Sequence, residues 1–372
     1  MTMNHLIPTT ARRLPILLSR PPPLLRPWQR TLHTTPAFLS TVKPSISLLA
    51  RLRQETQVSM TKAKEALVKT NNDYDAALVW LQEDEQASGA KKAEKVKGRT
   101  ASEGLVGVAS MEALGRGAGV LTRGAIVELN CETDFVSRND AFRTLVTQIA
   151  TTALFLHDLV PVTATPTRYI HPLPLELILS APLLPHPTST ASTSPTATVH
   201  DSILSLIGKL GENITLRRAA VMATLPNVVP RGSKDRVLLT SHYVHGGSDV
   251  ATGKIGALVV MGVSEAAAGP GVDVARLGRN LARQVVGYAP RYLRVEDVPT
   301  DADGAGEDEA VLLRQGYMLG SGETVGEAVE KVADEEGVKI EVLEFVRWEG
   351  GEGIEKKEDD FVGEVLRAAG KT

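Results

Sequence analysis

Apolar residues recur every three or four positions between residues 48 and 81, the spacing that places them on one face of an α-helix. The polar run at residues 71–73 interrupts this period, and an Asn or Asp side chain there can cap a third helix. The pattern predicts a small three-helix module over residues 44–86. Such a module buries little surface, so we expect it to lean on a neighbouring domain or on a partner.

Two later segments lack the apolar period of a packed element. Residues 87–103 begin with small and basic side chains, which favours a solvated linker or a frayed helix. Residues 160–198 are rich in Thr and Ser and hold eight prolines. Because proline removes a backbone donor and interrupts helices and central strands, we expect a disordered or loosely attached insertion there.

After residue 104 the apolar period changes to two or to continuous runs, which indicates β-strands. Two runs rich in Val and Ile predict a hairpin or meander, and Asn139 or Asp140 can cap the amphipathic helix that follows. We then expect a helix capped by Asp201, two strands joined by a hairpin turn, a helix, and finally helix, strand and helix. In chain order, the strand runs and these later elements are residues 105–109, 125–129, 203–210, 236–245, 254–261, 272–286, 325–332, 340–346 and 361–366.

These elements predict an α+β fold in which antiparallel strands have helices packed on one side. No regular βαβ alternation supports a parallel, dinucleotide-binding sheet. We expect two related core subdomains, residues 104–262 and residues 263–372, with the proline-rich insertion inside the first.

Charge divides the chain unevenly. Residues 1–54 contain eight Lys and Arg and no acidic residue, which is typical of a mitochondrial transit peptide and predicts residues 1–40 as that segment. The remainder has 41 − 8 = 33 basic against 44 acidic side chains, a net charge of −11. That balance argues against nonspecific nucleic-acid binding. Pro or a charge breaks every apolar stretch before it reaches membrane-spanning length, so we expect no membrane partner.

The sequence contains no motif that predicts catalysis, a metal site or a cofactor. Gly253-Lys254 has the wrong spacing for a phosphate loop and is followed by Ile255, so a hairpin turn is favoured. The glycines at residues 320–326 do not have dinucleotide-binding spacing. His242 and His245 are three residues apart on one predicted strand and would face opposite sides of it, which disfavours a shared metal.

Cys131 is the only cysteine. Glu132 and Asp134 beside it would raise the pKa of its thiol, so a buried cysteine at a strand end is favoured over a nucleophile. A strand-to-helix turn follows at residues 130–136 and places Asp134 and Phe135 side by side. Taken alone, these two residues can brace the turn and enter the core, or can contact a partner.

Several motifs together resemble one known family. Residues 128–136 (ELNCETDFV) resemble the signature of elongation factor Ts, the nucleotide exchange factor of elongation factor Tu. Residues 47–53 with 60–67 resemble its N-terminal ubiquitin-associated (UBA-like) helical module, and residues 209–214 with Arg217-Arg218 resemble its second signature. The likeness covers residues 45–150 and 201–370. The insertion is foreign to the family, and residues 57–59 lack the glycines usual between the first two helices.

The resemblance implies roles for individual residues. Asp134 and Phe135, together with the flanking Thr133 and Val136, would contact elongation factor Tu. Phe135 would wedge into an apolar crevice, and Asp134 would disturb the groups around magnesium and phosphate.

Three further positions match family contacts with the partner, although each also has a structural interpretation. His245 lies in a Tyr-x-His-Gly motif and can equally be a structural histidine. Arg53 and Met60 lie on the helical module, where a solvated Arg and a core Met are the alternatives. Arg217 and Arg218 are better explained as strand residues that brace the fold.

The function implied is guanine nucleotide exchange on mitochondrial elongation factor Tu, in its GDP-bound and nucleotide-free forms, within the matrix and without bond-making catalysis. Two other classes remain as alternatives. The helical module suggests a ubiquitin-binding adaptor, and Cys131 suggests a thiol-dependent acyl-transfer enzyme.

Overall fold

The computed structural model describes residues 42–56, 58, 60–112, 122–156, 159, 168–188, 197–222, 236–264, 271–299 and 308–355. The chain divides between Tyr74 and Asp75 into two compact units, which are described separately. The predicted transit peptide and the predicted helix at residues 361–366 lie outside the described residues. No helix in the described ranges is long and apolar enough to span a membrane.

The first unit contains helices α1 (Ile46–Thr56) and α2 (Met60–Lys69), and α3 (Tyr74–Val96) begins at its end. Asn71 and Asn72 adopt positive φ angles in the turn after α2, a conformation that Asn tolerates better than most residues. The Asn72 side chain accepts a hydrogen bond from the Ser45 backbone N–H at 2.8 Å, which fixes the turn to the start of α1. Helices therefore form where the apolar period predicts them, while the UBA-like assignment stays a prediction.

Helix α3 continues through residues 87–96, where the composition favours a linker or a frayed helix. Contacts in the second unit stabilise this part. Gly89 packs so closely on α7 (Val199–Leu210) that an added Cβ would lie 2.3 Å from the Leu204 carbonyl oxygen. Lys92 donates to the Gly208 carbonyl, and Val96 is buried in the core. Tertiary packing thus outweighs the weak local pattern.

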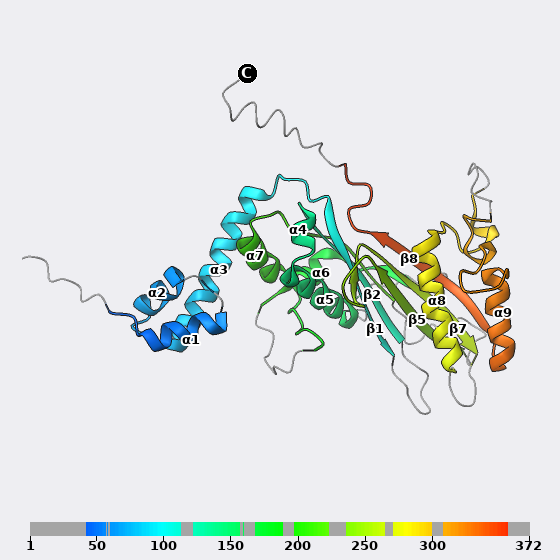
Figure 1. Ribbon diagram of the computed structural model, residues 1–372, viewed down its shortest axis with the longest axis horizontal. Helices are drawn as coiled ribbons and strands as arrows, with labels where there is room; N and C mark the ends of the chain where they lie inside the picture. Colours follow the sequence, from blue (N-terminus) through cyan, green and yellow to red (C-terminus); the bar gives the residue numbers. More distant parts are fainter. Residues whose placement is uncertain are drawn as a thin grey trace, which may run out of the picture. The chain divides into compact units, whose positions relative to one another are not determined.

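The second unit contains two antiparallel sheets (Figure 1). The first sheet has the strand order β3 (Ile170–Pro172), β4 (Thr215–Met222), β2 (Thr122–Cys131), β1 (Glu103–Glu112) and β6 (Thr252–Gly253). Strands β1 and β2 pair from Glu103 opposite Cys131 to Glu112 opposite Thr122, which confirms the predicted antiparallel pairing.

The second sheet has the order β5 (Arg236–His245), β7 (Ile255–Ser264) and β8 (Ile340–Glu349). Its β5–β7 pairing confirms the second predicted hairpin. The chain changes sheet between β4 and β5, whereas the predicted division between subdomains falls at residues 262/263, inside β7. The dipeptide β6, within the loop that joins β5 to β7, returns to pair with β1 of the first sheet.

The two sheets pack face to face, and helices cover their outer faces. Alternate residues on one strand therefore enter different cores: Leu105 packs under α5 (Asp140–Phe155), and Val106 faces the second sheet. Helices α8 (Val272–Tyr288) and α9 (Val325–Glu336) cover the second sheet (Figure 1). Burial on both faces explains why the strand runs are continuously apolar.

The expectation of a disordered insertion is wrong for residues 168–188. This segment forms strand β3 and helix α6 (Leu175–Ser180), and Ile178 is fully buried. Its prolines occupy positions that need no backbone donor, since Pro172 ends an edge strand and Pro174 is the N-cap residue of α6. Residues 160–167 and 189–196 lie outside the described ranges.

The start of α7 also differs from the prediction. Thr198, not Asp201, is the N-cap residue, and its hydroxyl accepts from the Asp201 backbone N–H at 3.1 Å. The Asp201 carboxylate in turn accepts from the Thr198 N–H, which completes a capping box. Asn139 caps α5, as one of the two predicted residues.

Candidate functional site

The candidate site lies where strand β2 ends at Cys131 and the short helix α4 (Asp134–Ser137) begins. Thr133 is the N-cap residue, and its hydroxyl accepts from the Val136 backbone N–H at 3.4 Å. The Ser137 hydroxyl donates to the Asp134 carbonyl at 3.0 Å. A helix of four residues cannot hold itself together in water, so contacts from outside must fix it.

Glu212 provides those contacts from the junction between α7 and β4. One of its carboxylate oxygens accepts from the backbone N–H groups of Glu132 and Thr133, at 3.1 and 3.0 Å. The other accepts from the Thr133 hydroxyl at 2.5 Å. The sequence places Glu212 in the second family signature but offers no sign of this contact, because 79 residues separate it from Thr133.

The structure separates the four predicted contact residues of this turn into two pairs. Phe135 is 81% exposed, and the Asp134 side chain is 40% exposed and forms an ion pair with Arg138 at 2.9 Å. Val136, in contrast, is only 8% exposed and packs in the core, while Glu212 already engages the Thr133 hydroxyl. Asp134 and Phe135 are thus the pair presented to solvent, and their neighbours hold the helix.

The other predicted contact residues lie elsewhere. His245 is exposed at the end of β5, just before a loop that turns at Gly246 with φ of +74°. No hydrogen bond or ion pair joins it to residues 133–136 in the described part of the chain. Arg53 and Met60 are exposed on α1 and α2 of the first unit, and the 51% exposure of Met60 does not fit a core methionine.

Arg217 and Arg218 brace the fold, as predicted. Both bind the fully buried carboxylate of Glu128, Arg217 at 3.0 Å. Glu128 also accepts from the Gly351 backbone N–H at 2.9 Å, and the Arg218 guanidinium stacks on the Trp348 ring at 4.5 Å. This cluster joins strands β2 and β4 to the end of β8.

Cys131 is fully buried, and its thiol lies 3.2 Å from the Thr133 carbonyl oxygen. Burial raises the pKa of the thiol to about 12, and the charge of Glu212 adds to the effect. A thiol of that pKa is protonated at neutral pH, and a buried one is closed to substrates. The acyl-transfer alternative therefore has no support at this residue.

Gly253 and Lys254 also have structural roles. Gly253 lies in β6 opposite Val106, and the Lys254 ammonium bonds the Glu103 carboxylate at 2.7 Å. The hairpin interpretation of this segment is confirmed. Among the described residues, no cluster of His, Cys, Asp and Glu is arranged to hold a metal ion.

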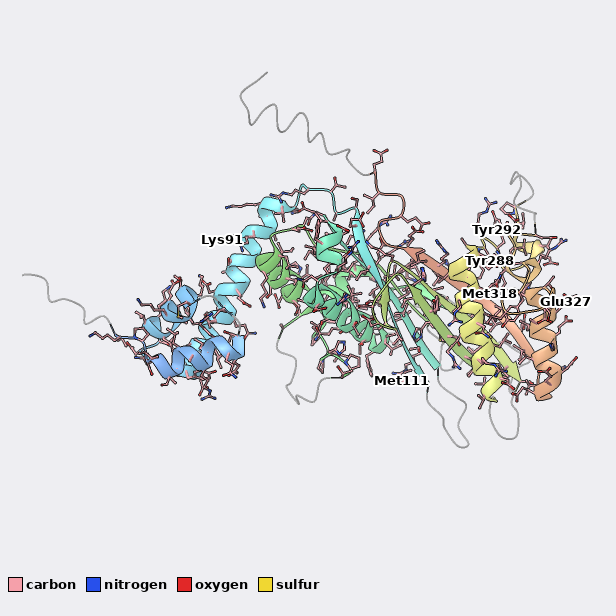
Figure 2. All side chains as sticks on the ribbon, in the orientation of Figure 1. Lys91, Met111, Tyr288, Tyr292, Met318 and Glu327 are labelled. Carbon is pink, nitrogen blue, oxygen red and sulfur yellow. The ribbon has the colours of Figure 1, made fainter. Side chains whose placement is uncertain are left out.

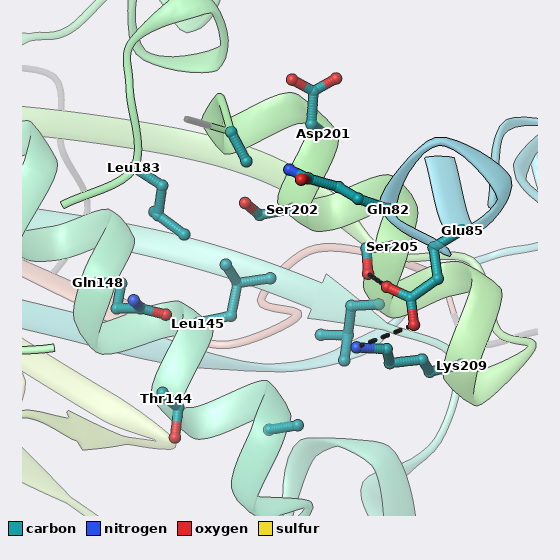
Figure 3. A pocket seen from close by; sticks show the side chains of 13 residues that line it. Gln82, Glu85, Thr144, Leu145, Gln148, Leu183, Asp201, Ser202, Ser205 and Lys209 are labelled. Carbon is teal, nitrogen blue, oxygen red and sulfur yellow. Dashed lines mark hydrogen bonds and ion pairs between the residues drawn. The ribbon is translucent and has the colours of Figure 1, made fainter. Parts of the chain in front are cut away.

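The cavities of the structure are weaker candidates for a functional site than helix α4 with its exposed Asp134 and Phe135. The cavity of about 400 Å³ between α3, α5 and α7 is shown in Figure 3. Glu85 there pairs with Lys209 at 3.6 Å and accepts from Ser205, while Gln148 donates to the Leu184 carbonyl. Another cavity, of about 570 Å³, has Tyr288 and Met318 in its lining (Figure 2). These contacts engage Glu85, Lys209, Ser205 and Gln148 within the chain itself, and we assign a ligand to neither cavity.

Comparison with known proteins agrees with the motifs at this site. The family model described as elongation factor TS matches residues 132–303. The chain is 39% identical over 335 residues to the mitochondrial elongation factor Ts of Coprinopsis cinerea, which covers 84% of this chain and 93% of that protein. It is 38% identical to the mitochondrial elongation factor Ts of Laccaria bicolor, in a match that covers 85% of this chain and 94% of that protein. Elongation factor Ts of the bacterium Agrobacterium fabrum is 33% identical, with coverage of 87% and 97%. The chain therefore belongs to the elongation factor Ts family.

Proposed function

We propose that this chain is the guanine nucleotide exchange factor of mitochondrial elongation factor Tu. Elongation factor Ts is a nucleotide exchange factor of translation elongation, and the fungal relatives are named as mitochondrial proteins. The acid-free segment at residues 1–54 supports delivery to the mitochondrial matrix through a transit peptide. The three N-terminal helices act in this proposal as a UBA-like module that adds contacts to the same partner.

The proposed activity requires that the chain bind the empty GTPase more tightly than the GDP-bound form. It requires no chemical step on the nucleotide. A GTPase holds GDP through backbone amides around the phosphates and through a bound magnesium ion. A partner that binds the empty GTPase more tightly than the loaded form shifts the equilibrium toward release. A difference of about 4 kcal/mol corresponds to roughly a thousandfold.

The observation that carries the proposal is the exposure of Phe135 on an anchored helix. An aromatic ring left 81% exposed has no role in the core of its own chain. Burying such a ring in a partner contributes about 1.5–3 kcal/mol. Because Thr133 and Val136 fix the two sides of the turn, little conformational entropy is lost when the ring enters a crevice.

Asp134 supplies the charge beside the ring. Its ion pair with Arg138 is solvent-exposed and is worth no more than about 1 kcal/mol, so the carboxylate can leave Arg138 for new partners at low cost. In the complex, Asp134 acts on the groups around the magnesium ion and weakens their hold on GDP. Phe135 and Asp134 thus work together, one by occupying space and one by charge.

The test is the release of labelled GDP from elongation factor Tu, with and without the mature chain. We expect a large acceleration, and we expect Phe135→Ala to reduce it at least tenfold. Phe155→Ala is the matched control, since Phe155 is a second Phe, 47% exposed, at the end of α5. Release that is unchanged by the wild-type chain would refute the exchange activity, and release equally fast with Phe135→Ala would refute the role of the ring.

A further inference from the structure

We propose that Glu212 is a positioning residue for nucleotide exchange, which acts by fixing the helix that presents Phe135. The inference rests on the proposed function. Glu212 lies half-buried behind the turn and reaches solvent only in part, so its effect on a partner passes through α4.

The first step of the argument is the number of groups that one carboxylate holds. Both backbone N–H groups before α4, those of Glu132 and Thr133, and the Thr133 hydroxyl all donate to Glu212. The Thr133 N–H, at the N-cap, is one of the donors that a helix start leaves without an intrahelical partner. Charge-assisted hydrogen bonds are about twice as strong as neutral ones, which suits a single side chain that anchors a whole turn.

The second step is that the anchoring is reciprocal. Glu132 accepts from the Asn213 backbone N–H at 2.6 Å, while Glu212 accepts from the Glu132 backbone N–H. Each junction therefore caps the backbone of the other. The Asn213 side chain also donates to the Arg99 carbonyl at 2.7 Å, which ties both junctions to the segment before β1.

The third step concerns how Glu212 reaches this position. Helix α7 ends at Leu210, and its C-cap residue Gly211 has a φ of +78°, the left-handed conformation that glycine adopts without strain. This C-cap reverses the chain direction directly before Glu212. The α7–β4 junction is thus shaped to deliver a carboxylate to the β2–α4 turn.

The consequence is that two contacts of different kinds orient the ring of Phe135. Val136 anchors α4 from the core side by apolar packing, and Glu212 anchors its N-terminal side by hydrogen bonds. Without Glu212 the turn keeps its core contact but loses its fixed orientation. Binding must then order the turn, which weakens the differential affinity on which exchange depends.

The experiment is a double-mutant cycle that combines Glu212→Ala with Phe135→Ala, read out by GDP release at saturating and at low concentrations of the chain. We expect each single variant to lower the maximal acceleration about tenfold. The double variant should be slowed far less than the product of the two effects, and any slowing beyond that of Phe135→Ala alone would come from Asp134 on the same helix. A double variant slowed by the product of both effects, about a hundredfold, would show that Glu212 does not act through Phe135 and would overturn the inference.

Two matched variants separate positioning from a general loss of structure. Glu344→Ala removes another carboxylate that accepts from two successive backbone N–H groups, those of Tyr169 at 2.5 Å and Ile170 at 2.9 Å. It should leave exchange unchanged. Glu212→Gln keeps an acceptor oxygen and should recover part of the lost rate. A rate loss with Glu344→Ala equal to that with Glu212→Ala counts against a specific role.

Amide hydrogen exchange distinguishes failure of this inference from failure of the proposed function. In the free chain, Glu212→Ala should raise the hydrogen-exchange rate of the Thr133 amide at least tenfold and leave the hydrogen-exchange rates of the β1 and β7 amides unchanged. If the wild-type chain does not accelerate GDP release from elongation factor Tu, the proposed nucleotide exchange function fails, whatever the effect of Glu212→Ala. If the Thr133 amide remains protected in Glu212→Ala, the anchoring fails even where GDP release is normal.

Discussion

Phe135 is 81% exposed, while its neighbour Val136 is 8% exposed and packs in the core under the first sheet. Substitutions at these two adjacent positions should therefore differ in how much they lower the stability of the fold. Phe135→Ala should change the free energy of unfolding by less than about 0.5 kcal/mol, because little is lost from an exposed position. Val136→Ala should cost about 1–3 kcal/mol through the cavity that it leaves.

Urea denaturation of the two variants measures this difference, and GDP release provides the second axis. Phe135→Ala should be folded and slow in exchange. Val136→Ala should be less stable, with exchange reduced mainly through a less ordered α4. If Phe135→Ala proves to be the less stable of the two, the ring has a core role that its exposure does not indicate.

The buried carboxylate of Glu128 predicts a large loss of stability on substitution. Glu128→Ala leaves Arg217 and Arg218 without their shared acceptor in a site where the carboxylate is fully buried. Removing one partner of a buried ionic cluster costs about 3–5 kcal/mol, and the partial exposure of both arginines favours the lower end. The measurement is the midpoint of urea unfolding.

Glu94→Ala is the control for this prediction. Glu94 pairs with Lys97 at 3.9 Å, and both side chains are more than three-quarters exposed, at 79% and 76%. Such a pair contributes well under 1 kcal/mol, so the variant should unfold at the wild-type midpoint. Equal midpoints for the Glu128 and Glu94 variants would contradict the bracing role of the cluster.

The sequence predicted best those elements whose signal is local. The period of Phe142, Leu145 and Ile149 marks α5, and all three are buried as predicted. Residues 105–109 form a strand, yet their continuous apolar run cannot tell which face meets a helix and which meets a second sheet. Only tertiary structure shows that Leu105 and Val106 belong to different cores.

Where prediction failed, a distant contact decided the outcome. Proline content indicated disorder near Ile178, but an edge strand and a helix start accommodate Pro172 and Pro174. At the candidate site, Asp134 and Phe135 were identified through their family motif, because their residue types alone permitted a core role. The hydrogen bonds from Thr133 to Glu212 span 79 residues, and no local pattern encodes such a pairing.

The raised pKa of Cys131 predicts a loss of stability in alkali. The thiol has a pKa of about 12 when folded, against a reference value of 9.0. Burial favours the neutral thiol. The contribution of this thiol to the free energy of unfolding is therefore fully present below about pH 9 and is lost as the pH rises toward 12. The slope from this single group reaches about 1.4 kcal/mol per pH unit.

Cys131→Ala isolates that slope from the titration of Lys and Tyr side chains in the same range. The difference in unfolding free energy between wild type and variant should be constant below pH 9 and should shrink above it. Iodoacetamide should also leave the native thiol unmodified at pH 7.5 and react only on unfolding. Rapid alkylation of the folded chain would show that Cys131 is accessible.

The close approach of the two sheets at Gly256 predicts that even one methyl group is too large there. A Cβ on Gly256 of β7 would lie 2.6 Å from the Val106 Cγ1 of β1. Val106 is fully buried and β-branched, so it cannot rotate away, and Gly256→Ala should cost about 1–3 kcal/mol.

Gly287→Ala, in the last turn of α8 with no atom within 4 Å of the new Cβ, should instead be neutral or stabilising by up to about 1 kcal/mol. Adding Val106→Ala to Gly256→Ala removes the opposing methyl, so the double variant should be more stable than the sum of the single effects predicts. Strict additivity in thermal or urea unfolding would mean that the two sheets do not meet at this pair.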